Sequence, residues 1–177
     1  MTCIIGYKYN DKVIMASDTE VSDDSSKNKD DIAKIFVNNG IIFGVAGDVV
    51  VNNELRWNFE PKYPSKACSD DEFICKYLRN QLKSFFKGCD NCFNKDDEFV
   101  GQLLICYNNK MWTISSDFAI TKVKGDYTAI GSGSDYALGA LYALQTSKID
   151  IYKKIKLAIQ SAGTFGTGCN MEVVFYE

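Results

Sequence analysis

Alternating apolar and polar positions at the start of the chain predict a β-hairpin, with Asn10 and Asp11 at its turn. Residues 41–46 are apolar throughout, which is typical of a strand that is buried on both faces. Other apolar runs predict further strands. The expected strands cover residues 2–9, 12–17, 34–37, 41–46, 99–107, 111–115, 119–124, 127–131 and 171–176.

Apolar residues that recur every three or four positions predict helices between these strands. Asp48 is placed to cap a helix over residues 49–57, and Ser69 or Asp70 to cap one that ends near Phe86. The apolar stripe expected on the second of these helices consists of Phe73, Tyr77, Leu78, Leu82 and Phe85. Two more helices are expected at residues 135–146 and 150–162, followed by a glycine-rich loop at 163–168.

Blocks of strands alternate with pairs of helices, not with single helices. That order favours an α+β fold, in which antiparallel sheets stack with helices outside them, over a doubly wound parallel sheet. The chain has 177 residues and shows neither an internal repeat nor a low-complexity linker. Residues 1–177 are therefore expected to form a single domain.

The composition is that of a globular protein, with 46% hydrophobic and 24% charged residues, but it includes no histidine. The missing histidine excludes Ser-His-Asp and Cys-His catalysis, His-ligated metals and imidazole pH switches. A net charge of −3 without a basic stretch argues against binding to nucleic acid. No apolar run approaches the roughly 18 residues of a membrane helix, so no membrane association is expected.

The chain has seven cysteines, an odd number, and its first residues lack a signal-peptide pattern. Free thiols in a reducing compartment are the simplest interpretation, so we expect a cytoplasmic protein. Cys89 and Cys92 form a single CxxC pair, which could be half of a zinc site completed by Cys68 and Cys75. Unpaired thiols in a polar loop are the favoured alternative, because neither a second CxxC nor a histidine completes the tetrahedron.

Thr2 is the first candidate for chemistry, because methionine in front of a small residue is normally removed. Loss of Met1 would leave Thr2 with a free α-amine. A terminal threonine holds nucleophile and base in one residue, since its Oγ attacks and its amine accepts the proton. The amine has an ordinary pKa of about 7.7–8.0, so it can replace the missing imidazole.

Three further residues fit a site around Thr2. Asp18 ends the second strand, Lys34 opens the third, and Gly47 ends the fourth. A buried Lys34 would lower the pKa values of the Thr2 Oγ and amine, Asp18 would balance its charge, and the Gly47 N–H would be an oxyanion donor. Alone, each residue is more typical of a salt bridge or of a turn glycine, and it is their joint occurrence that favours a site.

Residues 131–134, Gly-Ser-Gly-Ser, follow a strand and open a helix, as a phosphate-binding loop does. They lack the lysine of a P-loop and the third glycine of a dinucleotide site, so this signal is weak. Ser132 is instead a candidate to hydrogen-bond the terminal amine, and the alternative is that it only begins a helix.

At these positions the sequence resembles the proteasome β-subunit family, and within it most closely the bacterial HslV-type peptidases. The positions that match the family's catalytic threonine, aspartate, lysine and oxyanion glycine are Thr2, Asp18, Lys34 and Gly47. Residues 34–47 look like its third and fourth strands, and Ser132 matches its serine beside the threonine. The resemblance is weakest over residues 52–97. Two departures are Cys3, where HslV has a second threonine, and Ala162-Gly163-Thr164, where many β subunits carry an aspartate.

The resemblance implies an N-terminal nucleophile hydrolase fold, a four-layer αββα sandwich. It also implies a homo-oligomeric ring with the threonines facing an inner chamber, unfolded proteins as substrates, and an ATP-dependent unfoldase ring as partner. No cofactor would be needed for the chemistry. A structural monovalent cation would be held by the carbonyls of Gly163, Gly166 and Cys169.

Taken together, the residues and the resemblance predict a threonine endopeptidase subunit with a site of Thr2, Asp18, Lys34, Gly47 and Ser132. The alternative is a non-catalytic, proteasome-like structural or assembly subunit, for example a viral one, that retains Met1. A third, less favoured interpretation is a small-molecule amidase with the same nucleophile chemistry.

Overall fold

The computed structural model describes residues 2–19, 21–22, 27–28, 33–89, 91–96, 98–166, 169 and 172–176. Met1, whose removal would free the Thr2 amine, lies outside these residues. The strands are β1 (Ile4–Tyr9), β2 (Lys12–Asp18), β3 (Val21–Ser22), β4 (Lys27–Asn28), β5 (Ile35–Asn38), β6 (Ile41–Gly47), β7 (Gly101–Tyr107), β8 (Lys110–Ile114), β9 (Ile120–Lys122), β10 (Tyr127–Ile130) and β11 (Val173–Tyr176). The helices are α1 (Val49–Trp57), α2 (Asp70–Glu72), the π-helical segment η1 (Phe73–Leu78), α3 (Arg79–Lys87), α4 (Ser134–Leu144) and α5 (Ile151–Phe165).

The strands form two main antiparallel sheets. The first sheet has the order β10-β1-β2-β11, and the second has the order β5-β6-β7-β8-β9. The short strands β3 and β4, which the sequence pattern did not predict, pair only with each other among the described residues. The chain therefore enters the first sheet, crosses to the second, and returns to the first for β10 and β11.

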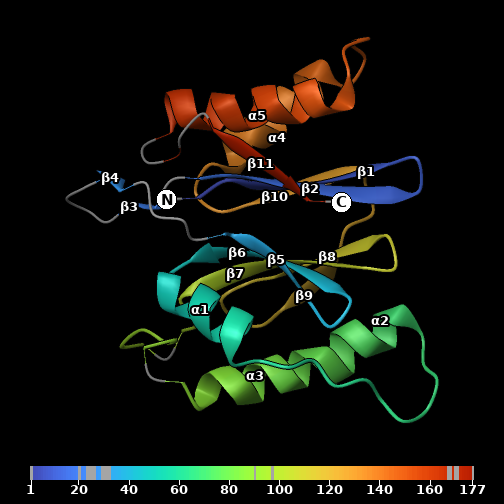
Figure 1. Ribbon diagram of the computed structural model, residues 1–177, viewed down its shortest axis with the longest axis vertical. Coiled ribbons are helices and arrows are strands. Elements are labelled where there is room, and N and C mark those ends of the chain that lie inside the picture. Colours follow the sequence, from blue (N-terminus) through green and yellow to red (C-terminus); the bar gives the residue numbers. More distant parts are fainter. Residues whose placement is uncertain are drawn as a thin grey trace.

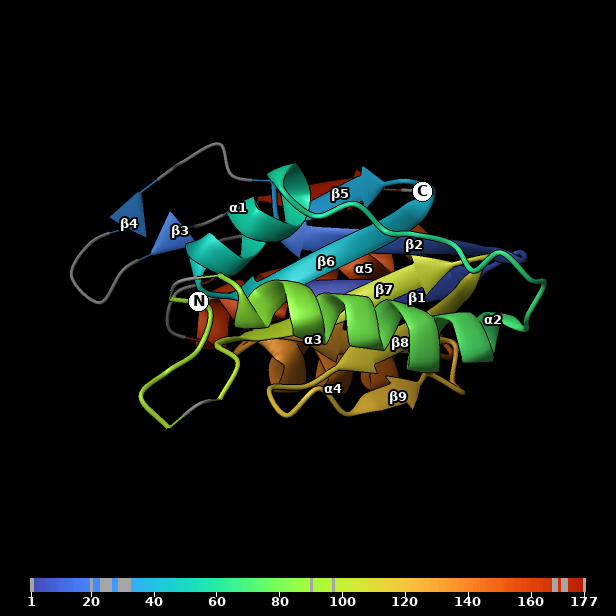
Figure 2. The same ribbon diagram turned by 90° about the horizontal axis from the view of Figure 1, so that it is seen from below.

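The sheets and helices are stacked in four layers (Figure 1). Helices α4 and α5 cover the outer face of the first sheet, and α1, α2 and α3 lie against the outer face of the second. Figure 2 shows α3 running across the strands of the second sheet. The predicted α+β architecture, a four-layer αββα sandwich, is confirmed.

Each of the three boundaries between layers has its own apolar core. Between the two sheets lie Ile4, Val13, Met15, Ile35, Ala46, Leu104, Cys106, Met111 and Ile130. The core under α4 and α5 includes Cys3, Ile5, Ile14, Ala16, Leu141, Ile155 and Ile159. The largest core, under α1 and α3, includes Phe43, Leu55, Phe73, Leu82, Phe86, Phe99 and Trp112.

The alternation of side chains along a strand explains why the strands read as almost continuously apolar. In β2, Val13 and Met15 face the second sheet, whereas Ile14 and Ala16 face the helices. The run at residues 41–46 divides in the same way, with Phe43 toward α1 and α3 and Ala46 toward the first sheet. The prediction of a strand buried on both faces is thus confirmed for β6.

The predicted helix caps are also present. The Asp48 carboxylate accepts the Val50 N–H at 3.0 Å at the start of α1. Ser69 Oγ accepts the Glu72 N–H at 3.1 Å, which makes Ser69 the cap and Asp70 the first residue of α2.

The apolar stripe predicted for the second helix packs on the core under α1 and α3, with Phe73, Leu78 and Leu82 buried and Tyr77 and Phe85 half-buried. The prediction did not include Ile74 and Phe86, which are fully buried. It also did not foresee the π-helix over residues 73–78, in which the Arg79 N–H donates to the carbonyl of Ile74, five residues earlier. The buried residues of this segment are Phe73, Ile74, Leu78, Leu82 and Phe86.

Two predicted strands begin later than expected. The strand predicted from residue 2 begins at Ile4, because the Thr2 backbone bonds to a turn instead of to a neighbouring strand. The strand predicted from Phe99 begins at Gly101, and Phe99 forms an isolated bridge with Phe93.

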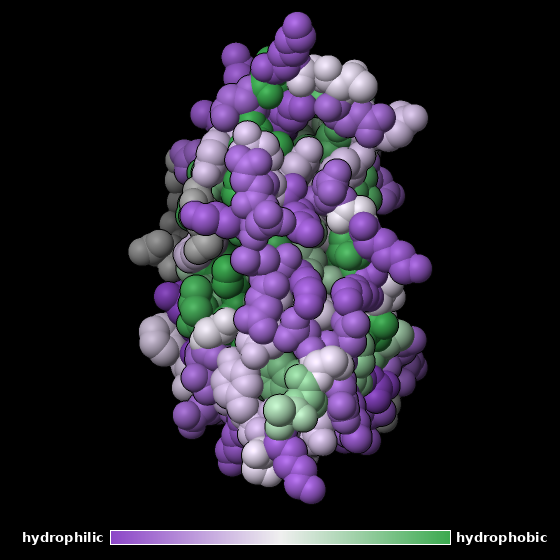
Figure 3. All heavy atoms as spheres, turned by 90° about the vertical axis from the view of Figure 1, so that its right-hand side faces the viewer, coloured by the Kyte–Doolittle hydropathy of each residue, from purple (hydrophilic) through white to green (hydrophobic). Residues whose placement is uncertain are grey.

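The surface is consistent with a chain whose apolar residues lie between the layers. The side that faces right in Figure 1 is mainly hydrophilic, with apolar residues in small separate patches (Figure 3). In the part of the chain that the structure describes, none of the helices combines the length and the apolar character needed to cross a bilayer.

Candidate active site

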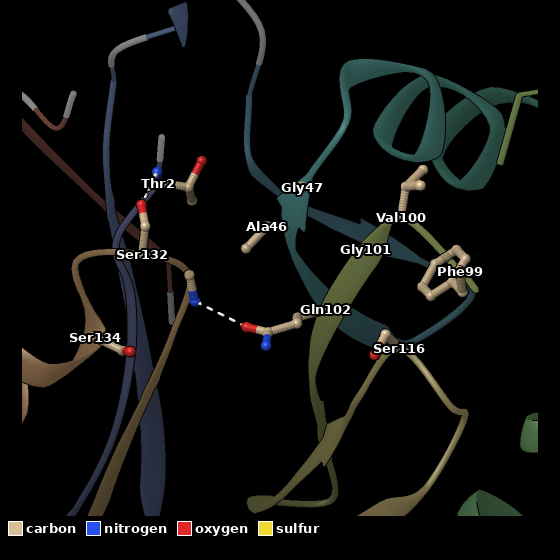
Figure 4. Close-up of a pocket in the computed structure, with 11 residues that line it drawn as sticks. Thr2, Ala46, Gly47, Phe99, Val100, Gly101, Gln102, Ser116, Ser132 and Ser134 are labelled. Atoms are coloured by element: carbon tan, nitrogen blue, oxygen red, sulfur yellow. Dashed lines mark hydrogen bonds between the residues drawn. The ribbon is translucent and has the colours of Figure 1, made fainter. Parts of the chain in front are cut away.

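A cavity of about 500 Å³ lies beside the start of β1, at the end of β6 and the start of β7 (Figure 4). Its lining comes from both sheets and from the turn after β10. The lining residues are Thr2, Ala46, Gly47, Phe99, Val100, Gly101, Gln102, Ser116, Gly131, Ser132 and Ser134. Three of the five predicted catalytic residues, Thr2, Gly47 and Ser132, therefore share one cavity.

Thr2 is held by the turn that joins β10 to α4. Its nitrogen donates to Ser132 Oγ at 3.4 Å, and its carbonyl accepts the Gly133 N–H at 3.1 Å. Only 9% of Thr2 is exposed. The predicted contact between Ser132 and the Thr2 nitrogen is thus present, although the chemical role of either residue stays a prediction.

The turn can approach Thr2 this closely because it contains two glycines. Gly131 has a φ of +89°, and a Cβ at this position would overlap the Thr2 carbonyl oxygen. A Cβ at Gly133 would lie 2.9 Å from the Cβ of Cys3. The Gly-Ser-Gly sequence is therefore explained by the close packing of this turn against residues 2–3.

Asp18 and Lys34 form a buried ion pair behind the start of β1. Lys34 Nζ donates to both carboxylate oxygens of Asp18 at 2.9 Å, and the two side chains are 7% and 0% exposed. Asp18 Oδ1 also accepts the Cys3 N–H at 2.8 Å. The carboxylate thus connects the lysine to the backbone of the residue that follows Thr2.

Gly47 ends β6 at the cavity wall with a φ of +129°, a conformation that L-residues with a side chain rarely adopt. A Cβ there would overlap the carbonyl oxygen of Val100 and would lie 2.7 Å from Gly101 Cα. Gly47 is therefore required by the close approach of β7, whatever its N–H does in chemistry.

Cys3, the nearest thiol to Thr2 in the sequence, is unsuited to act as a nucleophile. Burial raises the pKa of its thiol well above the ordinary value, with smaller contributions from Cys169 and Asp18. The thiol is also fully buried. Thr2 therefore has no competing nucleophile at position 3.

The three residues predicted to hold a cation lie near the end of α5. Gly163 is within the helix, Gly166 follows it and donates its N–H to the Ala162 carbonyl at 2.9 Å, and Cys169 is buried. Residues 167–168 and 170 lie outside the described part of the chain. The arrangement of these carbonyls around a cation therefore stays a prediction.

The CxxC pair differs from the polar loop that the sequence suggested. Cys92 is fully buried in the core under α3, and burial raises the pKa of its thiol to about 12. Cys89 Sγ lies 3.4 Å from the Phe85 carbonyl oxygen. Across the described residues, no three His, Cys, Asp or Glu side chains gather as a metal site requires.

The sequence analysis missed Gln102, which lines the cavity and accepts the Gly131 N–H at 3.1 Å through Oε1. The only signal for it was a polar residue in an apolar run, Val-Gly-Gln-Leu-Leu-Ile. Ser116 and Phe99, which also line the cavity, carried no such signal.

Comparison with known proteins relates this geometry to one family. Residues 1–52 match the family model described as "Proteasome subunit". The proteasome subunit beta type-4 of Drosophila melanogaster is 32% identical over 76 residues, which are 42% of this chain and 28% of that protein. The chain thus matches less than a third of the length of this relative.

Two solved structures share the fold over almost the whole chain. Thiobacillus denitrificans BPH, solved in complex with epoxomicin, has a TM-score of 0.78 and 17% identity, over 98% of this chain and 96% of that one. The eukaryotic HslV from Trypanosoma brucei has a TM-score of 0.66 and 18% identity, over 98% and 97% of the two chains. At these identities the likeness is one of fold.

The fold is therefore that of the N-terminal nucleophile hydrolases, as the sequence predicted. Together with the sequence match over residues 1–52, it confirms the resemblance to the proteasome β-subunit family. The chain is thus similar to proteasome subunits in the sequence of residues 1–52 and shares its fold with BPH and HslV.

Proposed function

We propose that this chain is the threonine peptidase subunit of a self-compartmentalising ring protease. Thr2 is the nucleophile after removal of Met1. The proposal is carried by one observation: the Thr2 nitrogen lies 3.4 Å from Ser132 Oγ in a cavity that Gly47 also lines. The match of residues 1–52 to proteasome subunits supports it.

In the proposed reaction, the Thr2 amine accepts the proton of its own Oγ, which attacks the carbonyl carbon of the scissile peptide bond. The amine then gives this proton to the leaving nitrogen, and an ester links Oγ to the acyl part of the substrate. Water hydrolyses that ester with the amine again as base. Ser132 orients the amine throughout.

The buried residues around Thr2 supply the electrostatics in this proposal. The positive charge of Lys34 favours deprotonation of the Thr2 Oγ and of the amine, and Asp18 balances the lysine charge. The Gly47 N–H donates to the oxyanion, an interaction worth about 2.7–4 kcal/mol in other hydrolases.

The assembly belongs to the same proposal. Subunits of this kind would form a homo-oligomeric ring that admits unfolded proteins, delivered by an ATP-dependent unfoldase ring in the cytoplasm. A monovalent cation held by the carbonyls of Gly163, Gly166 and Cys169 would brace the segment after α5. Native mass spectrometry of the untagged protein tests the ring, and dialysis against chelator-free buffers of different monovalent salts tests the cation through the melting temperature.

The decisive experiment combines intact-mass measurement with labelling by epoxomicin, the compound bound in the BPH structure. We expect the mass to lack Met1 and one molecule of epoxomicin to attach at Thr2, as located by peptide mapping. Thr2→Ala should remove labelling, and Thr2→Ser should retain it at a lower rate. A chain that keeps Met1 in full and takes up no label would contradict the peptidase and support a non-catalytic assembly subunit.

A further inference from the structure

The groups assigned to catalysis are divided between the two sheets. Asp18 ends β2 of the first sheet, Thr2 lies just before β1, and Ser132 follows β10. Lys34 directly precedes β5, and Gly47 ends β6, both in the second sheet. The chemistry thus requires that the two sheets keep a fixed relative position at the cavity. The ion pair of Asp18 and Lys34 is one connection between them.

Gln102 makes a second connection. It lies on β7, where it pairs with Ala46, the residue before Gly47. Its Oε1 accepts the Gly131 N–H at 3.1 Å across the cavity, as the dashed line in Figure 4 shows. A backbone N–H can only donate, so the amide oxygen of Gln102, and not its NH2, must face Gly131.

Gly131 is the first residue of the turn that holds Thr2. The same turn supplies Ser132 Oγ to the Thr2 nitrogen and the Gly133 N–H to the Thr2 carbonyl. The Gly131 backbone packs directly against the Thr2 carbonyl. A hydrogen bond that fixes the Gly131 nitrogen therefore also restrains Ser132 Oγ and the Gly133 N–H, which contact Thr2.

We infer that Gln102 is a positioning residue, which fixes the turn at residues 131–133 relative to β6, the strand that ends at Gly47. Through this turn, Gln102 also fixes the Thr2 amine. This inference rests on the proposed function. Gly131 lies beyond the last paired residue of β10, Ile130, so its N–H is not part of the strand ladder. The Gln102 side chain supplies the acceptor that this N–H needs at the cavity.

The position of Gln102 on its strand fits this role. Its neighbours Gly101 and Leu103 are buried, whereas Gln102 is exposed and faces the cavity. At an exposed strand position of no consequence, loss of the amide would cost little beyond one hydrogen bond. A positioning role for Gln102 therefore predicts that its substitution changes the chemistry at Thr2. A merely exposed strand residue predicts that it does not.

Gln81 offers a matched control on the same chain. Gln81 uses both ends of its amide, accepting the Lys62 N–H and donating to the Lys62 carbonyl, each at 2.8 Å. It lies on α3 and is not among the residues that line the cavity. Gln81→Met and Gln102→Met thus remove the same chemical group at two places.

The test is the rate of epoxomicin labelling at Thr2 as a function of pH. We expect Gln102→Met to lower the maximal rate about tenfold or more, and Gln81→Met to change it less than twofold. Gln102→Glu keeps the acceptor, so its maximal rate should stay within about threefold of the wild type. Its negative charge should shift the acidic limb of the profile to higher pH, because a nearby carboxylate favours the charged amine.

Equal labelling of Gln102→Met and the wild type at every pH would overturn the positioning role and leave the proposed function intact. If the wild type itself is not labelled, the proposed function fails, and amide hydrogen exchange then decides the role of Gln102. Faster amide exchange at Gly131 and Gly133 in Gln102→Met would support the positioning role of Gln102. Unchanged exchange at these residues would overturn that role.

Discussion

Lys34 Nζ lies 2.9 Å from both carboxylate oxygens of Asp18, although the two residues come from different sheets. Both side chains are buried, so neither charge can be solvated by water if the other is removed. Asp18 also accepts the Cys3 N–H, which places the pair directly behind the residue that follows Thr2. The pair therefore connects the two sheets and also supports the start of β1.

Breaking this pair should destabilise the fold strongly. Asp18→Asn removes the carboxylate that faces the buried Lys34 ammonium, and Lys34→Met removes the ammonium that faces the buried Asp18 carboxylate. Each change is expected to cost about 3–5 kcal/mol of unfolding free energy. Denaturant unfolding followed by tryptophan fluorescence measures this, and epoxomicin labelling should fall with it.

The double variant distinguishes the charge pair from general loss of packing. Asp18→Asn combined with Lys34→Met leaves no unpaired charge, so its cost should be smaller than the sum of the single costs by about 0.5–3 kcal/mol. Strictly additive costs would contradict an energetic coupling between Asp18 and Lys34. The double variant should still lose epoxomicin labelling at Thr2.

Gly47→Ala should impair both stability and labelling. A Cβ at this position would overlap the Val100 carbonyl oxygen at a φ of +129°, so we expect a loss of about 1–3 kcal/mol and displacement of the oxyanion strand. Gly139→Ala is the control, because a Cβ there meets nothing within 4 Å. It lies within α4 and should gain about 0.5–1 kcal/mol with unchanged labelling. Equal effects of the two substitutions on labelling would speak against the assignment of Gly47.

The acid stability of the protein should depend in part on Asp70. Hydrogen bonds from Lys110 Nζ at 2.6 Å and from Asn108 hold the pKa of the Asp70 carboxyl below its ordinary value of 3.8. A carboxylate with a lowered pKa stabilises the fold above that ordinary value, and the stabilisation is lost as the pH falls through the pKa of the folded state. Asp70→Asn should therefore lower the melting temperature at pH 7 but not near pH 2. The difference should shrink in high salt, because Lys110 is half-exposed and Asp70 is partly exposed, so ions screen the pair. A constant difference at all pH values would exclude this origin.

The π-helix makes a prediction about two adjacent phenylalanines. Phe86 is fully buried and Phe85 only half-buried, the reverse of a regular α-helical stripe through Phe73, Leu78 and Leu82. Phe86→Ala should cost about 3–5 kcal/mol and Phe85→Ala clearly less, as measured by urea unfolding. A larger cost for Phe85→Ala would contradict the burial of Phe86 in the core under α3.

Periodicity in the sequence was enough to predict most of the fold. Strands β1 and β2 were predictable from alternating positions around a turn, and β6 from its continuous apolar run. The caps Asp48 and Ser69 were predictable because they satisfy helix N–H groups locally. Thr2, Asp18, Lys34 and Gly47 were singled out from their places at the ends of predicted strands and from the family resemblance, and their catalytic roles stay predictions. Each of these signals depends on neighbours in sequence.

The features that were missed depend on neighbours in space. The π-helical turn is invisible to a stripe counted at 3.6 residues per turn, so Phe85 was expected in the place of Phe86. Cys92 looked like a loop thiol because its flanking residues are polar, yet it packs under α3. Gln102 acts, by our inference, on a residue 29 positions away. No local pattern could report that contact.

The order of strands in the first sheet has a consequence for synthesis. The second sheet is built from one continuous stretch, from β5 to β9, whereas the first needs β1 and β2, then β10, then β11 at the far end of the chain. Val173 of β11 pairs with Asp18 itself. A ribosome-bound chain thus carries Thr2 without the complete first sheet until β11 has been synthesised and has paired with β2. If Thr2 is the nucleophile that we propose, its surroundings are therefore incomplete until β11 is in place.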